Sequence, residues 1–199
     1  PICVGVGKPI DPHLVRLMMI TKVHALAKGF SGIHPDTLQR IIWHIGNNII
    51  PLVPEKGSVG ASGDLAPLAH LFLPLIGLGE VYADGKPVPS SVVLNQYGLQ
   101  PLQLGPKEGL ALINGTQFIL AYAIANTWRL HYCLEAADII GAMSLEALTG
   151  TKAPFDERLH RLRPFKGNQR GARRLRLLLR DSEIMQRHVD CGRVQDPYS

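Results

Sequence analysis

The sequence predicts a mainly α-helical protein with one small β-hairpin. Several segments place apolar residues close to helical spacing, and residues 116–148 form one long stretch that is apolar over most of a helix circumference. A single pair of short runs flanks an Asp-Gly turn, which is typical of a hairpin. The 199 residues are 46% apolar and 19% charged, which is enough for a sizeable core and excludes disorder and a fibrous repeat.

The first two predicted helices have clear ends. Residues 12–29 carry the first, with Asp11 as its N-terminal cap and Gly29 at its end. The second runs over about 34–45 and stops at Gly46, which is followed by two asparagines.

A glycine-rich segment, Gly57 to Gly63, precedes the third predicted helix. We expect that helix to begin at Leu65, with Asp64 as its cap. Residues 79–93 then predict the hairpin, which we expect to be the only sheet.

The long apolar helix over 116–148 predicts burial in a bundle or at a subunit interface. A loop is expected over 149–171 and a basic helix over about 172–188. No repeat, low-complexity tract or flexible linker divides the chain. We therefore interpret residues 1–199 as one continuous piece, and the abrupt ends suggest that it belongs to a longer polypeptide.

Composition argues against several classes of protein. No apolar run has the length and character of a membrane helix, and nothing at the start resembles a secretion signal. The cysteines are odd in number and widely spaced, which disfavours a disulfide scaffold and favours a reducing cytoplasm; we expect Cys133 to be a small core residue. His188 and Cys191 lack a second cluster that would complete a metal site, so no metal is expected. We expect His70 to be a packed helix residue rather than a ligand.

Positive charge is concentrated in one part of the chain. The net charge is +5, yet residues 151–180 hold ten basic and two acidic groups and carry +8, leaving −3 elsewhere. A basic nucleic-acid-binding helical module is therefore one alternative. No aromatic platform or recognition helix accompanies the run, so we interpret it as a solvated or subunit-contacting surface.

The sequence GSVGASGDLAP, residues 57–67, is the segment that predicts chemistry. Its glycines allow backbone conformations that are closed to other residues, so a tight turn is the simplest interpretation. An anion-binding loop at a helix N-terminus is a second, but the segment has no Gly-Lys-Ser/Thr, and Asp64 would repel phosphate.

A third interpretation uses the Ala61-Ser62-Gly63 triplet. If the nitrogen of Gly63 attacks the carbonyl carbon of Ala61, a five-membered ring forms, and loss of water there and from Ser62 leaves an exocyclic methylene. Gly63 has no side chain to obstruct its nitrogen, Ser62 carries the hydroxyl that is eliminated, and Ala61 is small enough for a compressed loop. The product is a strong electrophile, which no ordinary side chain provides.

The motifs GSVGASGDLAPLAH, GPKEGLALINGTQ, SLEAL and RVQDPYS occur in this order along the chain. Together they resemble the aromatic amino acid ammonia-lyase family, and SLEALTGT, SEIMQRH and RVQDPYS are similar to its histidine-type members. The resemblance covers essentially the whole chain. It implies a helical bundle of the ammonia-lyase/fumarase-like type and a homotetramer whose active sites draw on several subunits.

The resemblance also implies roles for individual residues. Ala61, Ser62 and Gly63 match the triplet that cyclises to 4-methylideneimidazol-5-one, with no external cofactor. Asn114 matches an asparagine that hydrogen-bonds the ring and contacts substrate. Tyr198 matches a tyrosine near the ring, and Gln195 matches a glutamine that lines the substrate pocket. The family's usual base, a tyrosine, would lie upstream of this sequence and its carboxylate-binding arginine just downstream, so we expect little activity from residues 1–199 alone.

The reaction implied is elimination of ammonia from L-histidine to give trans-urocanate. One departure bears on the substrate, because the position where histidine-specific members commonly carry a histidine aligns with Ile2. Phenylalanine or tyrosine ammonia-lyase and aminomutase activities of the same family are therefore kept as alternatives. The resemblance implies neither a nucleic-acid nor a membrane partner.

Overall fold

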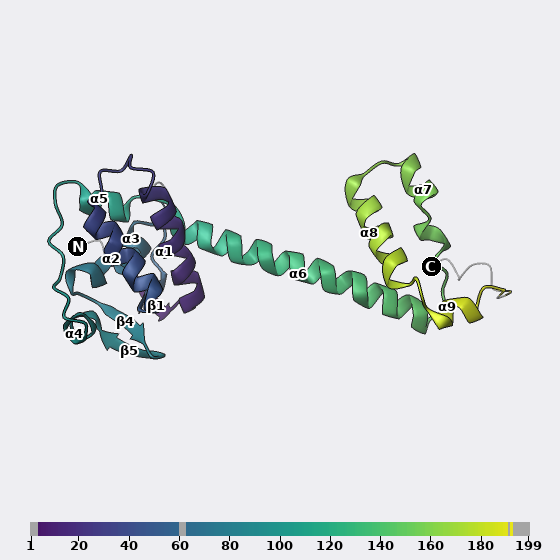
Figure 1. The fold of residues 1–199 in the computed structure, drawn as a ribbon, viewed down its shortest axis with the longest axis horizontal. Helices are drawn as coiled ribbons and strands as arrows, with labels where there is room; N and C mark the ends of the chain where they lie inside the picture. The colour runs from purple at the N-terminus through teal and green to yellow at the C-terminus, as the bar shows by residue number, and fades with distance from the viewer. Residues whose placement is uncertain (1–3, 60–62, 191, 193–199) are drawn as a thin grey trace. The chain divides into compact units, whose positions relative to one another are not determined.

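The computed structural model describes residues 4–59, 63–190 and 192. The chain divides into two compact units, Pro1–Asn126 and Thr127–Ser199 (Figure 1). As predicted, helices dominate the described chain.

The first unit is built mainly of short helices. The helices predicted from 12, 34 and 65 are present, and Asp11 caps the first by accepting from the backbone N–H of His13 at 2.8 Å. Two short helices that the sequence did not predict follow the hairpin. The helices are α1 (Pro12–Leu26), α2 (Pro35–Gly46), α3 (Leu65–Phe72), the 3₁₀ turn η1 (Leu73–Ile76), α4 (Ser90–Gln96) and α5 (Glu108–Ile113).

Two small sheets accompany these helices, so the expectation of a single sheet was wrong. The predicted hairpin is present as β4 (Glu80–Ala83) and β5 (Lys86–Pro89). A third strand, β2 (Ile50–Pro51), pairs with β4, while β1 (Val6–Pro9) pairs with β3 (Pro54–Lys56). These extra strands have two to four residues and pair with strands far away in sequence. They are too short to show the alternation of apolar and polar residues that predicts a strand.

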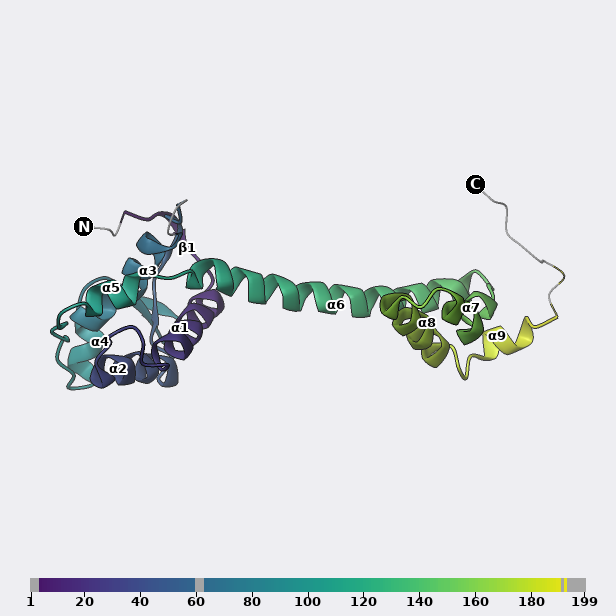
Figure 2. The same cartoon turned by 90° about the horizontal axis from the view of Figure 1, so that it is seen from above.

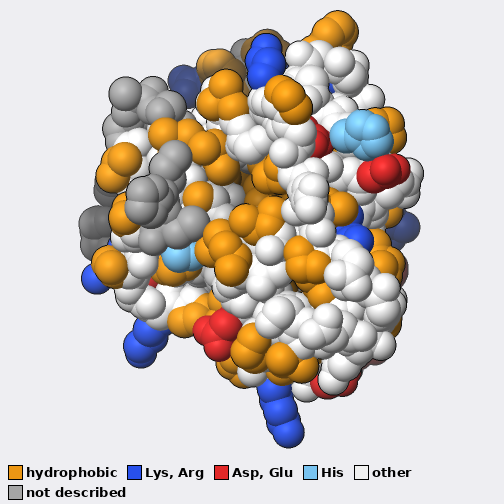
Figure 3. Space-filling model, turned by 90° about the vertical axis from the view of Figure 1, so that its left-hand side faces the viewer, with side chains coloured by type: hydrophobic (Ala, Val, Ile, Leu, Met, Phe, Trp, Pro, Cys, Tyr) orange, Lys and Arg blue, Asp and Glu red, His pale blue; other side chains and the backbone are white. Residues whose placement is uncertain are grey.

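The core of the first unit is formed largely by side chains of α1, α2 and α3, helices whose arrangement Figure 2 shows, and α3 also packs against α5. It is formed by the described buried residues Ile10, Val15, Met18, Met19, Leu26, Ile41, Ile50, Val53, Leu68, Leu71, Phe72, Leu75, Leu112, Phe118 and Ala121. Outside the core, Figure 3 shows hydrophobic side chains across the middle of one face of this unit.

The predicted long helix is present as α6 (Gln117–Ala147). In this single chain many of its apolar side chains are exposed, including Trp128, Tyr132 and Met143. Cys133 is exposed too, so the prediction that it is a core residue was wrong. The apolar sequence of a helix indicates that its side chains are buried against other protein surface. It does not show that this surface belongs to the same chain.

The second unit has more helix than predicted after α6. Asp156 accepts from the backbone N–H of Arg158 and starts α7 (Glu157–Leu162) inside the expected loop, after the 3₁₀ turn η2 (Ala153–Phe155). The expected basic helix is two helices, α8 (Lys166–Leu178) and α9 (Glu183–Arg187). Ser182 caps α9 and thereby separates it from α8. A small core of Ala142, Leu179 and Met185 supports this unit.

None of the helices in the described part of the chain is both long and apolar enough to cross a membrane.

Candidate active site

The glycine-rich segment brings Gly63 against Gly115, two residues before the start of α6. Gly63 has φ of +73°, in the left-handed region that favours glycine, and its carbonyl accepts from the backbone N–H of Val59 at 2.9 Å. Gly63 also forms an isolated parallel β-bridge with Gly115. The backbone of the predicted ring-forming triplet is therefore fixed, at its last residue, beside the Asn114-Gly115 pair.

Asp64 follows Gly63 and is completely buried. It occupies the N-terminal position of α3, as predicted, but its side chain does not cap that helix. Its Oδ2 accepts from the backbone N–H groups of Phe118 and Ile119 at 2.9 and 3.1 Å, in the first turn of α6, and its Oδ1 accepts from the Ser58 hydroxyl at 3.0 Å. The carboxylate thus satisfies free donors of a helix distant in sequence and joins it to the glycine-rich segment.

Asn114 ends α5 and has an extended backbone, with φ of −88° and ψ of 117°. Its carbonyl oxygen accepts from Nζ of Lys22, on α1, at 2.7 Å. Its N–H donates to the carbonyl of Leu110 at 3.0 Å. Hydrogen bonds at both its main-chain carbonyl and its main-chain N–H therefore hold Asn114 in place.

Gly115 and Gln117 lie in close contact. A Cβ at Gly115 would overlap the side-chain amide of Gln117, so any other residue at this position would require the end of that side chain to move. Gln117 is buried, and its Oε1 has no hydrogen-bond donor among the described residues. A buried acceptor of this kind needs a donor, so the surroundings of Gln117 call for a further polar group.

Glu108 fixes the start of α5, the helix that ends at Asn114. Its carboxylate accepts from the backbone N–H of Gly105 at 2.6 Å, the backbone N–H of His34 at 2.9 Å and the hydroxyl of Thr37 at 2.8 Å. Burial alone would raise the pKa of Glu108, but these hydrogen bonds outweigh it and hold the pKa below its usual value. The ionised carboxylate therefore ties α2 to α5.

His70 lies on α3, half-buried, and its Nε2 accepts from the backbone N–H of Gly5 at 3.2 Å. Burial lowers its pKa, which keeps the ring a neutral acceptor. This contact agrees with the predicted role of a packed helix residue. The described residues contain no group of three or more His, Cys, Asp or Glu side chains that could hold a metal ion.

The structure brings together two of the predicted site residues, Gly63 and Asn114, through the adjacent Gly115. The other predicted site residues, and the position that bears on the substrate, lie outside the described residues: Ala61, Ser62, Gln195, Tyr198 and Ile2.

Sequence reasoning missed the buried polar groups that support this pair. Lys22 could have been found, because it stands among Met18, Met19 and Leu26 on the buried face of α1, where a lysine is out of place. The role of Asp64 could not have been found from the sequence, because its hydrogen-bond partners Phe118 and Ile119 are 54 and 55 residues away.

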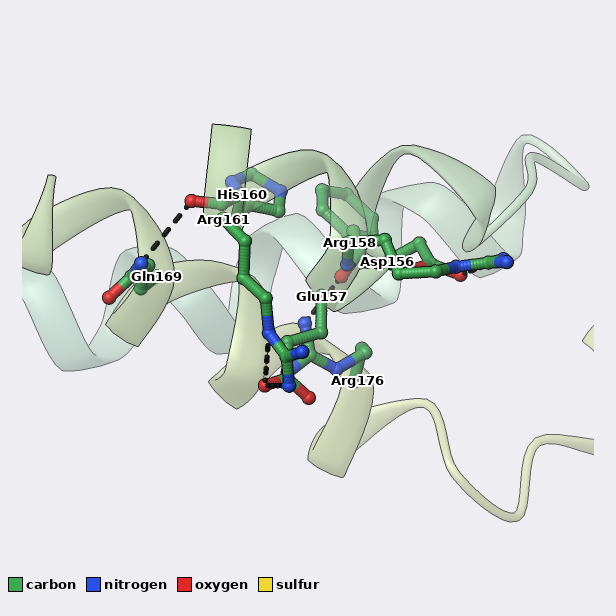
Figure 4. Close-up of polar contacts among 8 residues, drawn as sticks. Asp156, Glu157, Arg158, His160, Arg161, Gln169 and Arg176 are labelled. Atoms are coloured by element: carbon green, nitrogen blue, oxygen red, sulfur yellow. Dashed lines mark hydrogen bonds and ion pairs between the residues drawn. The ribbon is translucent and has the colours of Figure 1, made fainter. Parts of the chain in front are cut away.

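The basic segment of the second unit forms a pocket between α7 and α8 that none of the predicted site residues lines. Arg161 pairs with Glu157 at 2.6 Å and Gln169 donates to the carbonyl of His160 at 3.3 Å (Figure 4). Arg158 pairs with Asp156 at 2.8 Å. Part of the positive charge that suggested a nucleic-acid module is therefore compensated within the unit.

A sequence model of one family, aromatic amino acid lyase, matches residues 2–199. The chain belongs to this family. Among curated members, histidine ammonia-lyase of Sorangium cellulosum is 49% identical over 195 residues and that of Idiomarina loihiensis 46% identical over 196 residues. Both alignments cover 98% of this chain but 38% of the relative. This lyase-family chain therefore spans less than half the length of the curated relatives that it matches.

Solved structures agree with the family assignment. Histidine ammonia-lyase from Trypanosoma cruzi is 39% identical with a TM-score of 0.84, over 93% of this chain and 36% of that one. Phenylalanine aminomutase from Pantoea agglomerans is 31% identical with a TM-score of 0.86, over 92% of this chain and 35% of that one. The lyase chain thus has the ammonia-lyase/aminomutase fold, as its sequence predicted.

Proposed function

We propose that these residues belong to a carbon–nitrogen lyase that eliminates ammonia from L-histidine to give trans-urocanate. The observation that carries the proposal is the bridge between Gly63 and Gly115, which sets the end of the Ala-Ser-Gly triplet beside Asn114. The 45–49% identity to histidine ammonia-lyases over 98% of the chain supports histidine as the substrate.

We further propose that Ala61, Ser62 and Gly63 form the 4-methylideneimidazol-5-one ring without an external cofactor. Such a ring supplies an electrophile of a kind that no ordinary side chain provides. Two observations fit the group: the left-handed backbone of Gly63 favours glycine at that position, and the buried Oε1 of Gln117 lacks a donor among the described residues.

The chain's own residues would position and polarise this group. Asn114, held through its carbonyl by Lys22, would present its side-chain amide to the ring and substrate. Asp64 would keep the glycine-rich segment against the first turn of α6 and so limit the conformations open to the triplet. Gln195 would line the substrate pocket, and Tyr198 would lie near the ring and the substrate amine.

The complete enzyme needs more than these residues supply. We propose that residues 1–199 are one continuous piece of a longer lyase chain, which also carries a tyrosine base and a carboxylate-binding arginine. We propose a homotetramer that shares active sites between subunits, for which the exposed apolar side chains of α6 offer a surface. The free Cys133 thiol fits a reducing compartment, so we place the enzyme in the cytoplasm.

The first test is the mass of the full-length protein and of its 61–63 peptide. We expect the wild type to lack the mass of two waters in this peptide, and Ser62→Ala to retain them and lose turnover of histidine. Ser91→Ala, which removes an exposed hydroxyl on α4, is the matched control and keeps both properties. An unmodified wild-type peptide, or a fully active Ser62→Ala enzyme, contradicts the proposed function.

Product analysis separates elimination from the aminomutase alternative. Elimination from histidine gives the unsaturated acid and free ammonia, whereas an aminomutase returns the amine to the β-carbon. Comparing kcat/KM for histidine, phenylalanine and tyrosine tests whether histidine is the preferred substrate of an enzyme with isoleucine at position 2. The higher identity to a solved histidine ammonia-lyase, 39%, than to the Pantoea aminomutase, 31%, supports elimination from histidine.

A further inference from the structure

Lys22 is a buried lysine whose ammonium group reaches the candidate site. It lies in the middle of α1, and its relative exposure is 2%. Its Nζ donates to the carbonyl oxygen of Asn114 at 2.7 Å, across 92 residues of sequence. None of the ion pairs found among the described residues includes Lys22. The Asn114 carbonyl oxygen is therefore the hydrogen-bond acceptor that the structure shows for the Lys22 ammonium group.

A charge in this position costs stability. Burial lowers the pKa of Lys22 to about 8, so the ammonium form still predominates at neutral pH, although water would stabilise it better. Met18, Met19 and Leu26 occupy the same face of α1, so an unbranched apolar side chain at position 22 would suit the surroundings. If position 22 served only to pack the core, an apolar residue would be more stable there than a charged lysine.

The carbonyl that Lys22 holds belongs to the peptide between Asn114 and Gly115. The N–H of the same peptide is that of Gly115, the residue bridged to Gly63. A cation on the oxygen of a peptide polarises its N–H and restrains its rotation. Lys22 thus acts on a single peptide group that carries the Asn114 side chain at one end and approaches the triplet at the other.

We propose that Lys22 is a positioning residue of the ring site, holding the Asn114–Gly115 peptide so that the Asn114 amide and the Gly115 backbone are set beside the triplet. The inference rests on the proposed function, because it assigns Lys22 a part in building and using that site. Its effect passes through Asn114 and Gly115 and involves no contact with substrate.

The experiment compares three variants of the full-length enzyme. Lys22→Met removes the donor and charge with little change of volume, Lys22→Arg keeps both, and Lys28→Met changes an exposed lysine beyond the end of α1. The measurements are the water loss of the 61–63 peptide, kcat and KM for histidine, and thermal unfolding. We expect Lys22→Met to fold, to lower kcat by about 10- to 100-fold with little change in KM, and to retard water loss.

Rescue distinguishes positioning from simple core filling. We expect Lys22→Arg to regain kcat over Lys22→Met, and Lys28→Met to match the wild type. Wild-type kcat in a folded Lys22→Met enzyme, equal losses in the Met and Arg variants, or losses that only accompany unfolding would each overturn the role of Lys22. A wild type that neither loses water nor eliminates ammonia overturns the proposed function itself, and the inference with it.

Discussion

At the scale of single residues, His44 on α2 is buried with a relative exposure of 2%. Its Nδ1 contacts the carbonyl of Ile49 at 3.3 Å and therefore carries the proton, while Nε2 has no partner among the described residues. Burial lowers the pKa of His44 to about 4, an effect that the contact with Ile49 opposes and the charge of Arg40 reinforces. The folded protein therefore holds a neutral imidazole at neutral pH.

Acid should destabilise the fold through His44. Because the pKa of about 4 in the folded state lies below the ordinary 6.5, the unfolded chain binds the proton first, and stability falls as the pH drops from 6.5 towards 4. Between pH 7 and pH 5 we expect the wild type to lose about 2 kcal/mol relative to His44→Leu in urea unfolding. The exposed His24, changed to leucine, is the control and should follow the wild type. Parallel losses in wild type and His44→Leu would contradict this assignment.

At the scale of the elements, Asp64 joins the glycine-rich segment to α6. Its two carboxylate oxygens accept three hydrogen bonds, from Ser58, Phe118 and Ile119, and the side chain is fully buried. The negative charge also faces the positive end of the α6 dipole. The start of α6 therefore depends on a residue from another part of the sequence.

Removing this carboxylate should destabilise the first unit. We expect Asp64→Ala to cost about 2–4 kcal/mol in urea unfolding of the 199-residue chain, because buried N–H and O–H donors lose their acceptor. Asp64→Asn should cost less, since its amide oxygen still accepts from α6 although the charge is gone. Equal stability of the alanine variant and the wild type would show that water replaces the carboxylate at this point.

The same elements show what a sequence can predict. Asp11 and Asp64 both precede a helix, and both predict a cap. Asp11 caps its own helix, whereas the Asp64 side chain turns to α6, because the choice depends on tertiary contacts. The triplet and Asn114 were found from motifs and resemblance. The apolar face of α1 marks Lys22 as unusual, but local patterns do not report the distant partners of Lys22 and Glu108.

At the scale of the whole molecule, the two units differ in how much core they build. Among the described residues, the main core cluster of the first unit contains fifteen buried hydrophobic residues and a second cluster there contains three more, whereas the cluster of the second unit contains three. Helix α1 buries five side chains, while α8 buries Ala172 alone among its described residues. Since buried apolar area supplies most of the stability of a fold, the second unit has less of its own.

Native-state hydrogen exchange should register this difference. In the 199-residue chain we expect backbone amides of α8 to exchange on the order of 10- to 100-fold faster than those of α1, because opening α8 exposes little apolar surface. Peptide-resolved mass spectrometry at neutral pH measures both helices in one sample. Equal protection of α1 and α8 would mean that the small core around Leu179 holds the second unit as firmly as the larger core holds the first. Slower exchange of α8 in the full-length protein, with α1 unchanged, would show that chain or subunits beyond these residues stabilise the second unit, as the proposed tetramer predicts.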